Sequence, residues 1–241
     1  MKILILGHNG MLGNAVYKYF NNCNDYEVSI ITTSRYPEEE FLSYIKEYDG
    51  DYIINCIGAI PQKTNNFEIN CLLPVYLDLN TKCKIIHPGT DCESDTTQYG
   101  ISKRIASDWL WYIGTNTKII KTSIIGIDKK GYYSLLSWVL SQTNEIDGYV
   151  DAKWNGVTSL TWAKYCEYLI LNWDNAPRER IISCTTNVSK YTLLKLICEI
   201  FNHDIKINPI YGKGNDKTLK HGLLLEHIVT QLLELKEFYN E

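Results

Sequence analysis

Several features that mark particular classes of protein are missing from this chain. No apolar run approaches the roughly 18 residues that a membrane-spanning helix requires, and the first apolar run ends at Gly7. We therefore expect neither a membrane span nor a secretory signal peptide. Basic residues are not in excess, since 24 Lys and Arg stand against 28 Asp and Glu and the net charge is −4. This balance gives no reason to expect a nucleic acid or an anionic membrane as a partner.

Cysteine is present, but not in a metal-binding pattern. The chain has eight cysteines, and no two of them form a Cys-x-x-Cys pair. No cluster of histidines accompanies them, so we expect no zinc or other metal site. Cys56 and Cys184 lie inside apolar stretches, which indicates buried thiols. Free thiols without a secretory signal favour a reducing, cytoplasmic location.

What the chain does contain is a glycine-rich turn close to its start. Ile3-Leu4-Ile5-Leu6 predicts a strand buried on both faces, and residues 14–20 predict a helix. Gly7, Gly10 and Gly13 lie between them. A strand, a glycine turn and a helix N-terminus together form the arrangement that binds a dinucleotide pyrophosphate. The spacing is not the Gly-x-Gly-x-x-Gly of the common dehydrogenase fingerprint, so an ordinary strand-to-helix turn is the alternative.

Strands and helices alternate along the first half of the chain. This alternation predicts an α/β fold with a doubly wound parallel sheet. The expected strands are 3–6, 26–33, 51–58, 84–87 and 118–125, and the expected helices are 14–20, 38–48, 67–79 and 99–110. Pro88-Gly89 is expected to break the fourth of these strands.

The pattern changes after Gly126. The expected helices there are 132–142, 162–173, 191–201 and 226–239, the expected strands are 180–184 and 205–210, and 151–158 is polar and loop-like. We expect residues 1–127 to form a Rossmann domain that binds NAD(P). Residues 128–241 are expected to form most of a smaller, C-terminal substrate lobe. The two parts should be interleaved, with a helix at 160–175 returning to the first.

The ends of two early strands bear on the choice of cofactor. An NAD-preferring site usually has an acidic residue after the second strand, but here the first acid is Glu38. Arg35 instead offers a cation to a 2′-phosphate and Ser34 offers a hydroxyl, which favours NADP(H) over NAD(H). A surface arginine in a loop is the alternative. Residues 56–58, Cys56, Ile57 and Gly58, end the strand 51–58 and are expected to contact the cofactor.

Three polar residues further along suit carbonyl reduction. Tyr99 and Lys103 are four apart, so they share one face of the predicted helix. A tyrosine has a pKa of about 10, and a nearby ammonium would lower it. Thr90 offers a hydroxyl to a substrate oxygen. We therefore predict Thr90, Tyr99 and Lys103 as catalytic residues, with a hydride from nicotinamide and a proton from Tyr99. A pair of ordinary surface side chains is the alternative.

These motifs resemble the extended short-chain dehydrogenase/reductase superfamily, and within it the dTDP-4-dehydrorhamnose reductase branch. The matching segments are 5–13, Ile69-Asn70, Gly89-Thr90-Asp91 (Ser-Thr-Asp in the branch), 99–103 (Tyr-Gly-x-x-Lys), 121–123 (Arg-Thr-Ser) and 151–158. The similarity covers most of the chain and is strong up to Ser123. It implies an NAD(P)H-dependent reductase that acts on the 4-keto group of a nucleotide-activated deoxy sugar, as in dTDP-L-rhamnose-type biosynthesis.

The resemblance also implies which residues bind each ligand. The cofactor-binding residues would be Gly7, His8, Asn9, Gly10, Met11, Leu12, Gly13, Ser34, Arg35, Cys56, Ile57, Gly58, Asn70, Tyr99 and Lys103. The substrate-binding residues would be Thr90, Lys121, Thr122, Ser123, Trp154 and Asn155. The sequence leaves a homodimer open.

The chain departs from the branch at positions around the sugar pocket. The segment between Thr90 and Tyr99 is much shorter, Lys121 replaces an arginine, Val157 replaces a proline and Gly89 replaces a serine. A lysine cannot reproduce the bidentate contacts of an arginine. The sugar and its nucleotide carrier are therefore left open.

Two other functions remain as alternatives. One is an epimerase or dehydratase of the same superfamily. A dehydratase places an acid–base pair beside its catalytic Thr, whereas here Asp91 is followed by Cys92, and only Glu93 keeps this alternative open. The other is a cofactor-binding regulatory subunit without turnover, which the short segment after Thr90 would suit.

Overall fold

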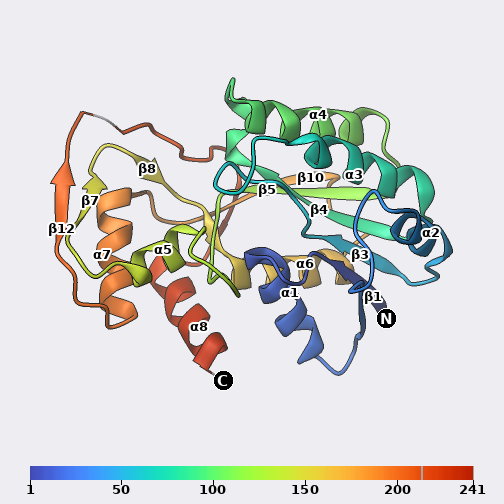
Figure 1. The fold of residues 1–241 in the computed structure, drawn as a ribbon, viewed down its shortest axis with the longest axis horizontal. Helices are drawn as coiled ribbons and strands as arrows, with labels where there is room; N and C mark the ends of the chain where they lie inside the picture. Colours follow the sequence, from blue (N-terminus) through green and yellow to red (C-terminus); the bar gives the residue numbers. More distant parts are fainter. Residues whose placement is uncertain (213, 241) are drawn as a thin grey trace.

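A seven-stranded parallel sheet forms the centre of the molecule (Figure 1). The computed structural model describes residues 1–212 and 214–240. The strand order is β13-β10-β5-β4-β3-β1-β2, and all six pairings are parallel. These strands are β1 (Lys2–Leu6), β2 (Glu27–Ile30), β3 (Tyr52–Asn55), β4 (Lys84–Thr90), β5 (Thr117–Thr122), β10 (Glu179–Cys184) and β13 (Leu223–Leu225). The prediction of a doubly wound parallel sheet is confirmed.

Helices cover both faces of this sheet. α2 (Glu39–Glu47), α3 (Glu68–Asn80) and α4 (Gln98–Tyr112) lie on one face, and α1 (Met11–Asn21) and α6 (Ser159–Leu171) lie on the other (Figure 1). The apolar run of β1 explains why both faces need cover. Ile3 and Ile5 pack with α1 and α6, whereas Leu4 and Leu6 pack with α2 and α3. Successive side chains of a strand point to opposite faces of the sheet, so a strand of apolar residues needs both faces to be covered.

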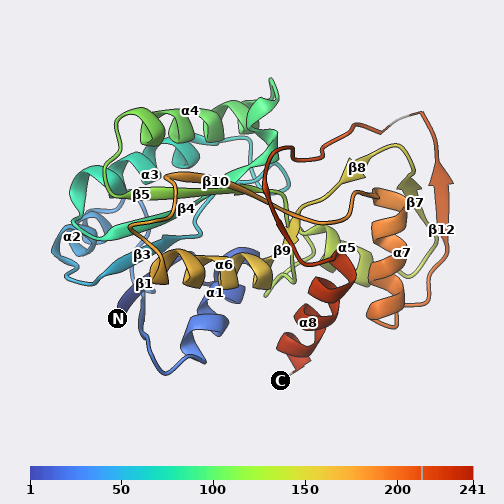
Figure 2. The same cartoon turned by 180° about the vertical axis from the view of Figure 1, so that it is seen from behind.

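The second half of the chain adds a smaller body with its own core (Figure 2). It contains α5 (Leu135–Ser141), α7 (Lys190–Ile200) and α8 (Ile228–Asn240), and the parallel pair β7 (Ile146–Tyr149) and β12 (Ile207–Ile210). Leu136, Leu193 and Leu232 are fully buried in this core. Shorter pairs are β6 (Ile124–Ile125) with β9 (Val157–Thr158), and β8 (Lys153–Trp154) with β11 (Val188–Ser189).

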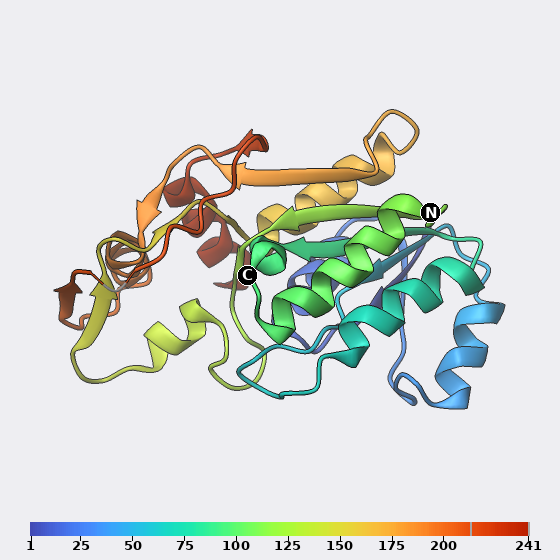
Figure 3. The same cartoon turned by 90° about the horizontal axis from the view of Figure 1, so that it is seen from above.

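The chain crosses between the two bodies more than once. α6, β10 and β13 come from the second half of the sequence but belong to the central sheet and its cover (Figure 3). Trp162 of α6 is fully buried in the same core as Val16 of α1. The carboxyl ends of β4 and β5 therefore face the second body, and that edge is where sites form in parallel sheets.

One expected strand boundary is wrong. Pro88-Gly89 does not end the fourth strand, because β4 continues to Thr90 and pairs with β5 over its whole length beyond Ile85. β3 pairs with β4 only as far as Ile86. The missing N–H of Pro88 therefore removes no pairing with β3, and a proline is tolerated where one side of a strand has no partner.

Other differences are smaller. The expected strand 118–125 is interrupted at Ser123, and the strand 26–33 is only Glu27–Ile30. β7 and β13 were not expected, because Ile146-Asp-Gly-Tyr carries a glycine and little apolar pattern, and Leu223–Leu225 has only three residues. Within the described residues, no helix is both long enough and apolar enough to cross a bilayer.

Candidate active site

The glycine turn after β1 has a conformation that its sequence requires. Gly7 has a φ of +79°, and a Cβ there would lie 2.9 Å from the backbone of Cys56. A Cβ on Gly13 would overlap the carbonyl of Gly7. Both positions are therefore restricted to glycine, the first by its backbone angle and the second by close packing of helix on strand.

The N-terminus of α1 is open to an anion. Gly10 is the N-cap residue, no side chain caps the helix, and no acidic residue lies in the first turn. Helix N-termini leave N–H groups without intrahelical partners and carry partial positive charge. A Cβ on Gly10 would contact only the Gly7 carbonyl, at 3.4 Å, so the space in front of the turn is free of protein. The residues Met11, Leu12 and Gly13 thus present N–H groups as a pyrophosphate site requires.

A pocket of about 350 Å³ adjoins this turn and brings the two predicted cofactor segments together. Its lining includes Gly7, His8, Asn9, Gly10, Ser34, Arg35 and Ile57, with apolar side chains from Ile31, Phe41 and Ile69. The backbone N–H of Arg35 donates to Glu38 Oε2 at 2.9 Å, so the first acid after β2 turns back to the same loop. The loop therefore holds one positive and one negative side chain near the pocket.

Asn70, a predicted cofactor-binding residue, makes its hydrogen bonds within the protein. Its Oδ1 accepts from the N–H of Ala59 at 2.8 Å, and its Nδ2 donates to the Ala59 carbonyl and to Ser102 Oγ at 3.0 and 3.2 Å. The side chain is almost fully buried. A Cβ on Gly58 would lie 3.2 Å from Asn70 Oδ1. Asn70 thus fixes the loop that follows β3 and joins α3 to α4.

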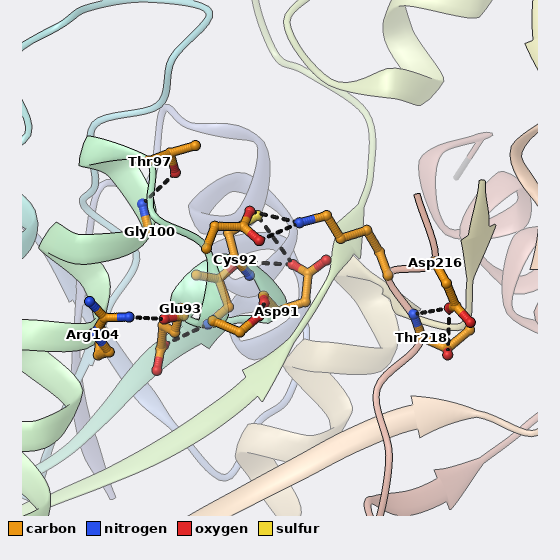
Figure 4. A network of polar contacts seen from close by, with 12 residues as sticks. Asp91, Cys92, Glu93, Thr97, Gly100, Arg104, Asp216 and Thr218 are labelled. Carbon is orange, nitrogen blue, oxygen red and sulfur yellow. Dashed lines mark hydrogen bonds and ion pairs between the residues drawn. The ribbon is translucent and has the colours of Figure 1, made fainter. Parts of the chain in front are cut away.

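Thr90 ends β4 and begins a short 3-10 turn, η1 (Asp91–Ser94) (Figure 4). Its hydroxyl donates to Asp91 Oδ1 at 3.0 Å and accepts from the N–H of Cys92. Its own N–H donates to Glu93 Oε1 at 2.9 Å. This reciprocal pattern is a capping box. It holds the Thr90 hydroxyl and the Asp91 carboxyl side by side at the carboxyl end of the sheet.

Tyr99 lies in the first turn of α4, whose N-cap Thr97 accepts from the N–H of Gly100 at 3.1 Å. The pKa of Tyr99 is raised to about 12, first by burial and then by the nearby Cys92, while the Thr90 hydroxyl acts in the lowering direction. The expected lowering of this pKa is therefore wrong for the cofactor-free protein, because desolvation of the phenolate outweighs the favourable contacts.

Lys103 follows Tyr99 by one helical turn and points to β4. Its Nζ donates to the carbonyl of Pro88 at 2.7 Å and lies 3.5 Å from His87 Nε2. The side chain is 5% exposed, and burial lowers the pKa of Lys103 to about 8. The structure thus places the amine against the strand that carries Thr90.

The predicted substrate residues fall into two groups. Lys121 lines a second pocket of about 510 Å³ together with Thr90, Asp91 and Glu93. Its Nζ pairs with Glu93 and with Glu179, both at 3.0 Å. Thr122 lies beside it on β5 and is 1% exposed. This first group adjoins the catalytic candidates.

The second group, Ser123, Trp154 and Asn155, forms hydrogen bonds within the protein. Trp154 Nε1 donates to Ser123 Oγ at 2.8 Å. Asn155 donates to the Leu219 carbonyl at 2.9 Å and accepts from the Leu219 N–H at 2.8 Å. Trp154 and Asn155 are 5% and 4% exposed. Their side-chain polar atoms are therefore paired within the protein, and Asn155 holds Leu219, which lines the pocket.

Three residues next to the site, Lys217, Asp95 and Lys129, were not predicted from the sequence. Lys217 Nζ contacts both carboxylate oxygens of Asp95, at 2.6 and 2.7 Å, and joins the C-terminal segment that carries Asp216 and Thr218 to η1 (Figure 4). Lys129 Nζ donates to Asn9 Oδ1 at 3.2 Å, beside the glycine turn. Lys217 and Asp95 are 122 residues apart, and no local pattern links them.

Among residues 1–212 and 214–240, no group of His, Cys, Asp and Glu side chains is arranged to hold a metal ion. The eight cysteines are free thiols. Burial raises the pKa of several of them, including Cys56 and Cys166. Groups of this kind remain protonated at neutral pH and are poor metal ligands.

The parallel sheet and its helical cover on both faces define a Rossmann-type fold. The chain has this fold in a form similar to the dTDP-4-dehydrorhamnose reductases. The structure from Clostridium acetobutylicum matches with a TM-score of 0.77 and 17% identity, covering 100% of both chains. That from Bacillus anthracis, in complex with NADP, matches with a TM-score of 0.78 and 15% identity over 98% of both chains.

The same fold also supports other reactions. UDP-N-acetylglucosamine 4-epimerase from Bacillus cereus matches with a TM-score of 0.72 and 17% identity, covering 100% of this chain and 96% of that one. No family model matches the chain, and no curated protein matches it by sequence. The likeness therefore establishes the fold, and the activity has to be argued from the site.

Proposed function

We propose that this protein is an NADP(H)-dependent reductase of the 4-keto group of a nucleotide-activated deoxy sugar. The observation that carries the proposal is the meeting of two features at one edge of the sheet. An uncapped helix N-terminus with a glycine turn follows β1, and Thr90 ends β4 at the same edge, with Tyr99 and Lys103 on the adjacent helix α4, in a fold shared with a dTDP-4-dehydrorhamnose reductase. Neither feature alone specifies a reductase.

The residues fit a nicotinamide dinucleotide. The N–H groups at the start of α1 would take the pyrophosphate, and Arg35 with Ser34 would take a 2′-phosphate, which is why we favour NADP(H). Asn70 would hold the loop after β3 in place. When bound, the reduced nicotinamide supplies a hydride. The protein has to supply a proton and to position the carbonyl that accepts the hydride.

Tyr99 is suited to give that proton. With a pKa raised to about 12, it keeps its hydrogen at neutral pH and can donate only to an oxygen that gains negative charge. Thr90 would hydrogen-bond the same oxygen. Asp91 accepts from the Thr90 hydroxyl, and burial raises the pKa of Asp91. Because a hydroxyl has one hydrogen to donate, the O–H of Thr90 would turn from Asp91 Oδ1 to the carbonyl oxygen when a substrate binds.

We assign residues 128–241 mostly to the recognition of the sugar nucleotide. The pocket of about 510 Å³ lies between η1 and the C-terminal segment 216–220. Lys121 would face a substrate from the sheet, while Trp154 and Asn155 would shape the pocket wall.

The many free thiols suit a reducing, cytoplasmic setting.

The epimerase or dehydratase alternative has less support from this site. Its second acid would have to be Glu93, but Glu93 is bound to the Thr90 N–H and to Lys121 and is 6% exposed. A carboxylate held by two partners is a poor proton carrier. The regulatory-subunit alternative is favoured by the short η1 segment alone.

One experiment separates these functions. The protein is incubated with NADPH and a panel of nucleotide-linked 4-keto sugars, and the loss of nicotinamide absorbance is followed, with Tyr99→Phe as control. Oxidation of NADPH by the wild type but not by the variant supports the reductase. In a second mixture that holds NADP+ and the parent nucleotide sugars with a C4 hydroxyl, product without net formation of NADPH supports an epimerase or dehydratase. Tight NADPH binding with no turnover of any sugar supports a regulatory subunit.

A further inference from the structure

A buried row of three polar side chains lies beneath the catalytic edge. Asn55 ends β3, His87 lies on β4 and Lys103 lies on α4. Their exposed fractions are 0%, 1% and 5%. Asn55 Nδ2 is 3.2 Å from His87 Nδ1, and His87 Nε2 is 3.5 Å from Lys103 Nζ. The imidazole therefore bridges the amide and the amine, away from solvent.

The backbone sets the direction of the first contact. Asn55 Oδ1 accepts from the N–H of Ile57 at 3.0 Å, and a backbone N–H can only donate. The other end of the amide, Nδ2, must then be the group that faces His87. It donates to Nδ1, so Nδ1 carries the lone pair. In a neutral imidazole the proton must therefore be on Nε2.

This tautomer constrains Lys103. The Nε2–H of His87 points at Lys103 Nζ, which already donates to the Pro88 carbonyl at 2.7 Å. An ammonium group has three donors and no acceptor, so it would oppose the Nε2–H. A neutral amine has a lone pair for His87 and two hydrogens, one of which serves Pro88. Only the neutral form satisfies both contacts.

The charges around the amine agree with this assignment. Burial lowers the pKa of Lys103, and it lowers the pKa of His87 well below the ordinary value. Glu93 from η1 and Cys71 from α3 act on Lys103 in the opposite direction. Glu93 is also paired with Lys121 at 3.0 Å, which weakens its attraction for a charge on Lys103. The pKa of Cys71 is raised, so its thiol keeps its hydrogen and donates to the Ser102 carbonyl.

We propose that His87 is a positioning residue that favours the neutral amine form of Lys103 against the Pro88 carbonyl, and that at mildly alkaline pH binding of the nicotinamide dinucleotide takes up a proton from solvent at Lys103. The second half rests on the proposed function. The incoming phosphates carry negative charge and the ribose hydroxyls accept hydrogen bonds, and both favour an ammonium. The uptake converts Lys103 Nζ from an amine to an ammonium, with no other bond formed or broken.

The first test needs no cofactor. The chain is labelled with 13C at lysine Cε and titrated by NMR, with Lys103→Met identifying the Lys103 signal. We expect a midpoint near pH 8, as the buried amine requires. In His87→Gln an amide oxygen can accept from the ammonium, so the midpoint should move toward the ordinary value of about 10.4. An exposed-site control, His227→Gln, should leave it unchanged. A wild-type midpoint near 10 overturns the proposal.

The second test measures proton uptake when NADPH binds. Calorimetry at pH 8.5 in buffers of different ionisation enthalpy should give more than about half a proton per site. His8, whose pKa is lowered by burial and by Lys129, is neutral at that pH and does not contribute. Uptake should vanish in Lys103→Met and fall at least twofold in His87→Gln.

The two tests separate the inference from the proposed function. NADPH binding without proton uptake in the wild type overturns the inference and leaves the reductase standing. Absence of NADPH binding overturns the proposed function and, with it, the uptake step. The cofactor-free titration still decides whether His87 favours the neutral form of Lys103. If His87→Gln does not fold, 15N NMR of the His87 ring in the wild type replaces it: a proton on Nε2 is expected, and a proton on Nδ1 overturns the proposal.

Discussion

The two sides of the site are held together in different ways. The cofactor side is one continuous stretch, in which Gly7 and Gly13 bring strand and helix into direct backbone contact. The substrate side joins the end of η1 to a segment more than 120 residues away, through the ion pair of Lys217 with Asp95. Backbone packing is costly to disturb, whereas a partly exposed ion pair contributes little. The cofactor side should therefore be rigid and the substrate side adaptable.

The largest expected effect lies where the two sides meet. Tyr99→Phe removes one hydroxyl and should lower kcat by about 10²–10⁴, the usual contribution of a positioned acid. NADPH affinity, measured by calorimetry, should be unchanged because the ring remains. Turnover near that of the wild type on the true substrate would show that another group gives the proton.

The glycine turn offers a matched pair of changes. Gly10→Val keeps the fold, because only the Gly7 carbonyl lies near, at 3.4 Å, but it fills the phosphate space. Loss of charged hydrogen bonds worth about 1.5–3 kcal/mol each predicts a fall in NADPH affinity of about 10²-fold or more. Calorimetry checks the affinity and circular dichroism checks the fold.

Gly13→Ala is the counterpart, because its Cβ overlaps the Gly7 carbonyl. Overpacking costs about 1–3 kcal/mol, and each kcal/mol lowers Tm by about 2–4 °C at this chain length. Scanning calorimetry should find Gly13→Ala less stable than Gly10→Ala. Equal stability of the two alanine variants contradicts the assigned packing.

Cofactor preference should respond to the two charges beside the pocket. Arg35→Ala removes the cation and should weaken NADPH by about tenfold, near the lower limit for a charged hydrogen bond, while NADH changes little. Glu38→Gln keeps an acceptor for the Arg35 N–H but removes a negative charge, so NADPH should gain relative to NADH. If Arg35→Ala weakens both dinucleotides equally, Arg35 does not contact the 2′-phosphate.

The smallest effect on stability is expected at the contact between the two bodies. Lys217→Met and Asp95→Asn should each cost no more than about 1 kcal/mol, as for partly exposed pairs. Both should raise KM for the sugar nucleotide a few-fold and leave NADPH affinity alone. The double variant should be no worse than either single one. Lys206→Met, which breaks the exposed pair with Glu145, serves as control.

The difference between the two sides also explains what could be predicted from the sequence. The glycine turn, the alternation of elements and the order Thr90, Tyr99, Lys103 are local patterns, and local patterns fix strands, helix faces and backbone angles. The parallel sheet was therefore predicted correctly except for its edge strand β13, and the strands that carry the site candidates of the first half end at its carboxyl edge.

The rest depends on which distant segments meet. No periodicity in the sequence shows that Lys217 pairs with Asp95. Nor does it show that Trp154 bonds to Ser123 and Asn155 to Leu219. The direction of the Tyr99 pKa shift was also missed, because burial depends on packing from several elements. The continuation of β4 through Pro88 depends on where its neighbour β3 ends.

The shortness of η1 has a consequence for engineering. Only residues 91–97 separate β4 from α4, so this segment is short for one side of the pocket of about 510 Å³. Residues 216–220, which lie outside the sheet and its helical cover, line the pocket opposite this short segment. We therefore expect that exchanging residues 216–220 alone can change the range of substrates, while β4 and α4 stay unchanged.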